Sequence, residues 1–113
     1  MSRPRRCRIV DSQPSVTFFK PAGVRMVDLE EVILTVDEFE SVRLKDFDGL
    51  SQELCAERMD VSQPTFHRLV ISARGKIADC VVNGKALIIK GGNFEITPYK
   101  NKRKKECLRH GGK

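Results

Sequence analysis

Six side chains between positions 62 and 71 are suited to reading the edges of bases in duplex DNA. Gln63 can bond N6 and N7 of an adenine, and Arg68 can bond O6 and N7 of a guanine. Thr65 and Ile71 carry methyl groups that can contact a thymine, and His67 can reach a base, a phosphate or only solvent. The group comprises Ser62, Gln63, Thr65, His67, Arg68 and Ile71. Any one of them alone is an ordinary surface residue, so the inference depends on the whole group.

Reading base edges requires a helix that a second helix and a short turn hold in the major groove. Ser51 can cap a helix over 52–59, and Ser62 can cap the next helix, with Pro64 in its first turn. Asp60 can adopt the left-handed backbone that a tight turn needs. The small and apolar residues that such a pair requires are Ala56, Val61, Phe66 and Leu69. We therefore predict a helix-turn-helix over 52–71 with a recognition helix over 63–74. An ordinary helical hairpin has a similar core pattern, but the exposed side chains favour DNA binding.

Helix signals also lie on both sides of this segment. Thr35 and Glu38 fit a capping box, which predicts a helix from there to Asp48-Gly49. The helix that starts near 63 should continue to 82 and end at Asn83-Gly84, with Val81 on its apolar face. Residues 28–32 could form a single helical turn.

The strand signals are shorter. Residues 16–19, 86–90 and 93–97 are rich in β-branched and aromatic side chains. Gly91-Gly92 suits a hairpin between the last two runs, although either run could instead pair with 16–19. The predicted fold class is mainly α, a three-to-four-helix helix-turn-helix domain with a small β-hairpin or short strands and basic tails at both ends. We expect a flexible basic arm over 1–13, a single domain over 14–97 and a disordered basic tail over 98–113.

Charge is distributed unevenly along the 113 residues, whose net charge is +6. The two ends are strongly basic, and Arg3, Arg5 and Arg6 in the first arm are expected to contact DNA. Acidic residues dominate 28–60, whereas basic residues dominate 61–90. DNA should therefore meet the second half, with Arg74 and Lys76 as phosphate contacts. The acidic first half should face away from phosphate.

Other classes of protein are less compatible with the sequence. No apolar run is long enough to span a bilayer and no signal peptide is evident, so we expect a cytoplasmic protein. Cys107 and His110 form one close pair of soft ligands and Cys7 offers a third, but structural zinc uses four. We therefore expect no metal and no cofactor. Neither a phosphate-binding glycine loop nor a catalytic triad is present, so we do not expect an enzyme.

Several short motifs together resemble a small, mostly prokaryotic family of poorly characterised predicted DNA-binding proteins. Their helix-turn-helix is similar to the fourth conserved region of bacterial sigma factors. The resemblance spans residues 3–94 and implies sequence-specific DNA binding and transcriptional regulation. Asp60 stands where the family usually has Gly, and Cys55 where it usually has Ala. The matching motifs are Gly49-Leu50-Ser51-Gln52-Glu53, Ala56-Glu57-Arg58-Met59, Val61-Ser62, Thr65-Phe66, Arg3-Pro4-Arg5 with Cys7, Phe19-Lys20-Pro21-Ala22-Gly23, Leu34-Thr35, Gly84-Lys85-Ala86-Leu87 and Gly91-Gly92.

Two alternatives remain open at this stage. The acidic residues of 28–60 could dock RNA polymerase or another transcription protein, or the basic tails could bind DNA or RNA without specificity. Deleting 1–10 and 98–113 would separate tail-driven from helix-driven binding. A homodimer would raise specificity because one recognition helix reads only a few base pairs, but nothing in the sequence identifies a dimer surface.

Overall fold

Local capping signals set the ends of the helices in the computed structural model, which describes residues 7–98. α1 spans Val36–Val42 and begins at the predicted capping box: Glu38 N donates to Thr35 Oγ1, and Thr35 N donates to Glu38 Oε1. It runs directly into a π-helical turn, η2, over Arg43–Phe47. α2 spans Gln52–Met59 and α3 spans Gln63–Asn83. Gly84, in the left-handed conformation, ends α3 as predicted.

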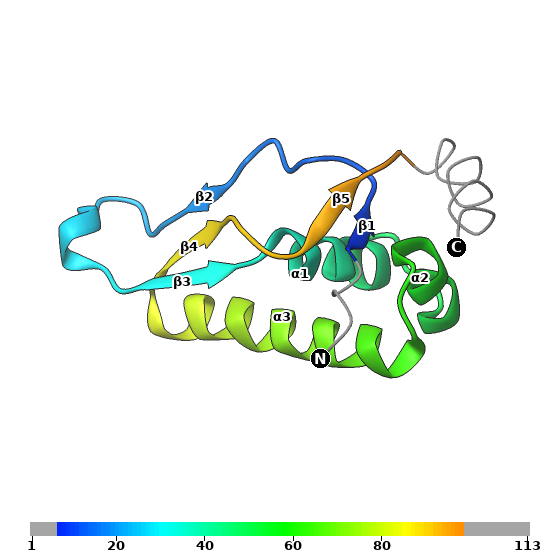
Figure 1. Ribbon diagram of the computed structural model, residues 1–113. Coiled ribbons are helices and arrows are strands. Elements are labelled where there is room, and N and C mark those ends of the chain that lie inside the picture. Colours follow the sequence, from blue (N-terminus) through cyan, green and yellow to red (C-terminus); the bar gives the residue numbers. More distant parts are fainter. Residues whose placement is uncertain (1–6, 99–113) are drawn as a thin grey trace, which may run out of the picture.

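Within residues 7–98, five short strands lie on the other side of the domain from α3 (Figure 1). β2 (Phe18–Phe19), β4 (Ala86–Ile89) and β3 (Glu31–Leu34) form a sheet in that order. β4 is antiparallel to β2 and parallel to β3. β1 (Arg8–Val10) and β5 (Phe94–Ile96) form a separate parallel pair. A three-residue 3-10 turn, η1, occupies Met26–Asp28.

The predicted hairpin between 86–90 and 93–97 is wrong. β5 pairs with β1 instead, while β4 pairs with Phe18–Phe19, as the alternative allowed. Gly91 and Gly92 both have positive φ, but Gly91 O accepts a hydrogen bond of 3.0 Å from Val36 N. The linker therefore packs on the start of α1 and directs the chain away from β4.

Three further expectations differ from the structure. The flexible arm was expected to reach residue 13, yet Ile9 and Val10 are buried in β1 because the β5 strand and α1 cover them. The helical turn expected over 28–32 ends at Asp28, because Glu31 and its neighbours pair with β4. Val81 was placed on the apolar face of its helix but is 78% exposed, since Ile77 and Cys80 occupy the side that faces the domain.

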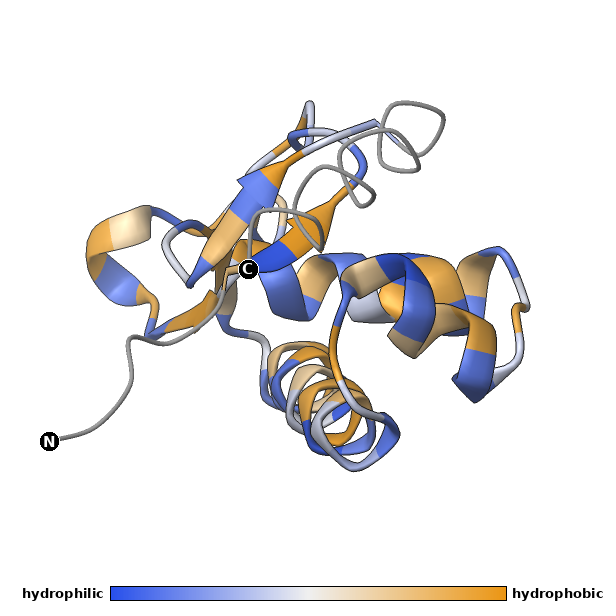
Figure 2. Cartoon of the chain, turned by 45° about the vertical axis from the view of Figure 1, so that its right-hand side comes forward, coloured by the Kyte–Doolittle hydropathy of each residue, from blue (hydrophilic) through white to orange (hydrophobic). Residues whose placement is uncertain are grey.

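Two apolar clusters hold the domain together, and α3 contributes to both. The first joins η2 and α2 to the beginning of α3, with residues Leu44, Cys55, Ala56, Met59, Phe66 and Val70. The second joins the strands and α1 to the middle of α3, with residues Val10, Leu34, Val36, Ala73 and Ile89. Polar and apolar residues alternate around the helices, as amphipathic packing requires (Figure 2). The domain is thus helix-rich but mixed, with three helices and a few short strands.

No helix within residues 7–98 is both long and apolar enough to cross a membrane.

Candidate nucleic-acid interface

A three-residue turn, residues 60–62, joins α2 to α3 and is held by backbone hydrogen bonds. Asp60 takes the left-handed conformation at φ 60° and ψ 46°, as the sequence predicted. Its N–H donates to the carbonyls of Ala56 and Glu57, and Val61 N donates to Ala56 O at 3.0 Å. Ser62 Oγ then accepts the N–H of Thr65 at 3.2 Å and caps α3. These bonds fix where α3 begins.

The packing of α2 on α3 fixes the angle between the two helices. Phe66 and Met59 have no exposed surface, and Ala56 is almost completely buried. A small side chain at Ala56 lets α3 come close, and Cys55 fills the adjoining space. Its thiol lies 3.7 Å from the carbonyl oxygen of Leu50, and burial raises the pKa of this thiol. The pair therefore presents the first turns of α3 rigidly.

The six predicted base-reading residues lie together on the first turns of α3. Five are exposed and Thr65 is half-buried; Ile71, for example, has 49% of its surface exposed. Ser62 Oγ donates to Thr65 Oγ1 at 2.9 Å, and Arg68 Nη2 lies 3.4 Å from the same oxygen. Within residues 7–98 no carboxylate forms an ion pair with Arg68. Its guanidinium thus stands ready to bond an external acceptor.

Arg74 and Lys76, the predicted phosphate contacts, are instead engaged by carboxylates from the first half of the chain. Arg74 bonds Asp46 through two nitrogens, at 2.8 and 2.9 Å. Hydrogen bonding to Arg74 lowers the pKa of Asp46. Lys76 Nζ donates to Glu38 Oε1 at 2.8 Å. Arg74 and Asp46 are both substantially exposed, so their ion pair is weak and Arg74 can exchange Asp46 for a phosphate. The Glu38 side chain, in contrast, is only 10% exposed, so its pair with Lys76 is less easily exchanged.

The acidic and basic halves of the chain are therefore not fully separated in space. Acidic residues of 28–60 pair with basic residues of α3, and Glu30 also contacts Lys85, just after the end of α3, at 3.2 Å. Among these carboxylates Glu38 is the buried one, and it needs its partner because burying a charge without one is costly. No local pattern indicates these pairs, because the two residues of each α3 pair lie 28 or 38 positions apart in the chain.

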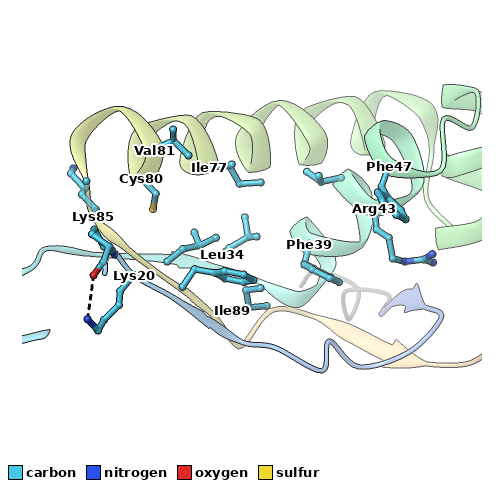
Figure 3. Close-up of a pocket in the computed structure, with 15 residues that line it drawn as sticks. Lys20, Leu34, Phe39, Arg43, Phe47, Ile77, Cys80, Val81, Lys85 and Ile89 are labelled. Carbon is cyan, nitrogen blue, oxygen red and sulfur yellow. Dashed lines mark hydrogen bonds between the residues drawn. The ribbon is translucent and has the colours of Figure 1, made fainter. Parts of the chain in front are cut away.

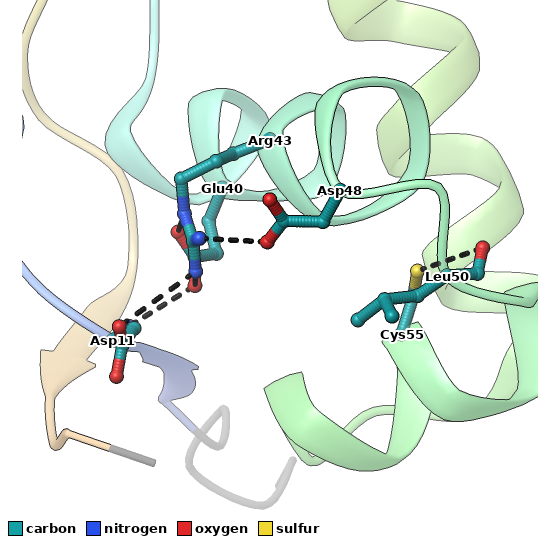
Figure 4. Close-up of polar contacts among 6 residues, drawn as sticks. All are labelled: Asp11, Glu40, Arg43, Asp48, Leu50 and Cys55. Carbon is teal, nitrogen blue, oxygen red and sulfur yellow. Dashed lines mark hydrogen bonds and ion pairs between the residues drawn. The ribbon is translucent and has the colours of Figure 1, made fainter.

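A second ion-pair network holds η2 and the N-terminal segment against α1 (Figure 4). Arg43 bonds Glu40 through Nε and Nη2 at 2.9 and 2.8 Å and Asp48 through Nη1 at 3.0 Å. Its Nη2 also lies 3.9 Å from Asp11 Oδ2. Hydrogen bonding to Glu40 raises the pKa of Arg43. This network fixes the segment from which α2 emerges.

The structure does not describe several of the other candidate residues. Arg3, Arg5, Arg6, Cys107 and His110 lie outside the described residues. In the described part of the chain no three His, Cys, Asp or Glu side chains are placed to hold a metal ion. Cys7 is exposed, and Cys55 and Cys80 are buried free thiols.

These features define a class, a small helix-rich mixed domain that presents the exposed amino-terminal turns of a long helix. Residues 1–97 match the family model described as "Protein of unknown function DUF134", so the chain belongs to that family. A UPF0251 protein of Thermoanaerobacter pseudethanolicus is 59% identical over 96 residues, which cover 85% of this chain and 81% of the relative. A UPF0251 protein of Pelotomaculum thermopropionicum is 50% identical over 111 residues, covering 98% and 81% of the two chains. No solved structure gives a significant match.

Proposed function

We propose that this protein binds specific sequences in double-stranded DNA and regulates transcription. In this proposal α2, the turn at Asp60 and α3 act as a helix-turn-helix, similar to that of sigma-factor region four, and residues 63–74 form the recognition helix. The observation that carries the proposal is the exposed group at the start of α3, with Arg68 unpaired by any carboxylate of residues 7–98. Such a group, held on a rigid helix pair, matches what entry into a major groove requires.

Each part of the site has a separate role in the proposal. Gln63 and Arg68 read base edges, while Ile71 packs on a thymine methyl group. The exchangeable Arg74 contacts a phosphate, which positions the protein without reading sequence. Arg3, Arg5 and Arg6 add attraction to the duplex by releasing counterions. No metal or cofactor has a role.

The proposal is tested by selecting sites from a library of random duplex DNA with the wild type and with Arg68→Ala. The wild type should enrich one motif, and Arg68→Ala should relax one position of it and weaken binding by about 1–3 kcal/mol. Arg25→Ala is the matched control, because Arg25 is an exposed arginine whose guanidinium pairs with Asp28, away from α3. This control should keep the wild-type motif.

The same selection can also contradict the proposal. Binding that enriches no motif, is equal in all three proteins and falls steeply with salt would mean that the basic ends bind nucleic acid without specificity. Docking of a transcription protein by the acidic residues of 28–60 has less support, because Glu38, Glu40, Asp46 and Asp48 are already engaged in ion pairs within the domain.

A further inference from the structure

An apolar cleft of about 850 Å³ lies between the second half of α3 and the three-stranded sheet (Figure 3). The side chains of Leu34, Phe39, Ile77, Leu87 and Ile89 form its inner surface. It lies beyond the turns of α3 that carry the proposed DNA contacts. The cleft is therefore a second surface, one that the proposed function leaves unused.

The rim of the cleft carries large apolar side chains that face solvent. Phe47 is 85% exposed and Val81 is 78% exposed, and Phe19 is half exposed. A small molecule inside the cleft would leave the outer faces of Phe47 and Val81 in water. Clustered apolar surface of this kind is typical of contacts between proteins. The occupant is therefore a protein surface.

The two ends of the cleft differ in a way that suits a second copy of this chain. Phe47 and Arg43 lie at one end, and Lys20, Cys80 and Lys85 lie at the other (Figure 3). Phe47 stands between Asp46 and Asp48 in the chain. Within residues 7–98, the Lys20 ammonium bonds only main-chain oxygens, those of Pro21 and Val24. At the Phe47 end, Arg43 is shared by the carboxylates of Glu40, Asp48 and Asp11, so these four side chains keep a net negative charge. The Lys20 end carries an ammonium with no carboxylate partner among residues 7–98.

We propose that two copies associate through this cleft around a two-fold axis. Phe47 of each copy packs at the partner's Val81 end, which brings Asp48, one of three carboxylates that share Arg43, toward the partner's Lys20. A two-fold contact requires a self-complementary surface: if one residue of the first copy contacts a second residue of the partner, the same two residues also meet with the copies exchanged. The chain's own C-terminal residues 99–113 suit the cleft poorly, because seven Lys and Arg among them would approach a rim that already carries Lys20 and Lys85.

Sedimentation of the purified full chain without DNA tests this inference. The wild type should form a dimer, and Phe47→Ala and Val81→Lys should each weaken it by roughly 30-fold or more, the effect of losing a major interface residue. Both side chains are so exposed that the variants should keep the wild-type fold, as shown by an unchanged circular dichroism spectrum. Val27→Lys is the matched control, since Val27 is 77% exposed but lies outside the cleft. It should dimerise like the wild type.

Mixing the two variants tests the swapped contact itself. Phe47→Ala keeps an intact Val81 end of the cleft, and Val81→Lys keeps an intact Phe47, so the mixture regains one of the two contacts. It should associate more tightly than either variant alone. A wild type that stays monomeric, a dimer unaffected by Phe47→Ala and Val81→Lys, or a mixture no tighter than its components would overturn the inference. Because no DNA is present, failure here would leave the DNA-binding proposal untouched.

Discussion

At the scale of single residues, Glu38 links the start of α1 to the middle of α3. Its carboxylate accepts hydrogen bonds from Thr35 N at 3.0 Å, Ser72 Oγ at 2.6 Å and Lys76 Nζ at 2.8 Å. Burial opposes ionisation, but the bonds from Lys76, Ser72 and Thr35 outweigh it, so the pKa of Glu38 is lowered from 4.5. One side chain thus caps a helix and orients a second one.

The lowered pKa of Glu38 makes the stability of the domain depend on pH. A carboxyl group with a depressed pKa stabilises the fold above its unfolded value, and this contribution is lost as the pH falls below about 4.5. Glu38→Gln should lower the free energy of unfolding by about 1–3 kcal/mol at neutral pH. It should also reduce the loss of stability in acid, as measured by urea unfolding over a pH series.

Glu31→Gln is the control for this experiment, because Glu31 is exposed on β3. It should change stability by less than about 0.5 kcal/mol and keep the acid dependence. If Glu38→Gln retained the wild-type dependence on pH, the ion pair with Lys76 would not be the source of the acid sensitivity.

At the scale of elements, the linker between β4 and β5 decides how the strands pair. Gly92 has φ +103°, and a Cβ built there would lie 2.4 Å from Asp37 Oδ1 and 2.9 Å from Thr35 Cβ. The linker thus rests directly on the first turn of α1. This contact, with the bond from Val36 N to Gly91 O, turns β5 toward β1.

Gly92→Ala should therefore lower the free energy of unfolding by about 1–3 kcal/mol, because it adds both a clash and backbone strain. Gly75→Ala is the matched comparison, since Gly75 lies inside α3 with no atom within 4 Å of an added Cβ. It should raise stability by about 0.5–1 kcal/mol, through the smaller conformational entropy of the unfolded chain. Urea unfolding measures both changes, and equal effects of the two substitutions would contradict this account.

At the scale of the whole molecule, the N-terminal segment belongs to the core. Val10 is part of the second apolar cluster, Ile9 is buried beside it, and Thr97 N donates to Val10 O at 2.8 Å. The chain therefore closes on itself, because β1 and β5 come from opposite ends of the described residues and pair in parallel.

Deleting residues 1–10 should unfold the domain, because truncating a large buried side chain costs about 2–5 kcal/mol and this deletion removes Ile9 and Val10. Deleting only residues 1–6 removes Arg3, Arg5 and Arg6 but no member of either apolar cluster. Its melting temperature should match that of the full chain, which makes it the right truncation for measuring what the basic arm adds to nucleic-acid binding. A folded 1–10 deletion, observed by circular dichroism, would show that β1 is dispensable.

The sequence by itself determined the helices and their ends, because those signals are local. Ser51 and Ser62 each cap a helix through an N–H three residues away, and Asp60 needs only its own backbone to make the turn. The capping box at Thr35 is likewise a contact within one helical turn. Such signals operate between neighbours in the chain, so α2, the turn after it and the start of α3 could be predicted without a tertiary structure.

Only the tertiary structure decided which distant segments meet. Short strands carry little information about their partners, and β5 joined β1 because the glycine linker packs on α1. The same holds for Arg74 and Lys76, which became partners of Asp46 and Glu38 when α1 and η2 packed along α3. The apolar cleft beside Phe47 also exists only once α3 and the sheet are placed together. Contacts between residues far apart in the chain depend on packing and charge compensation across the whole domain, which no local pattern encodes.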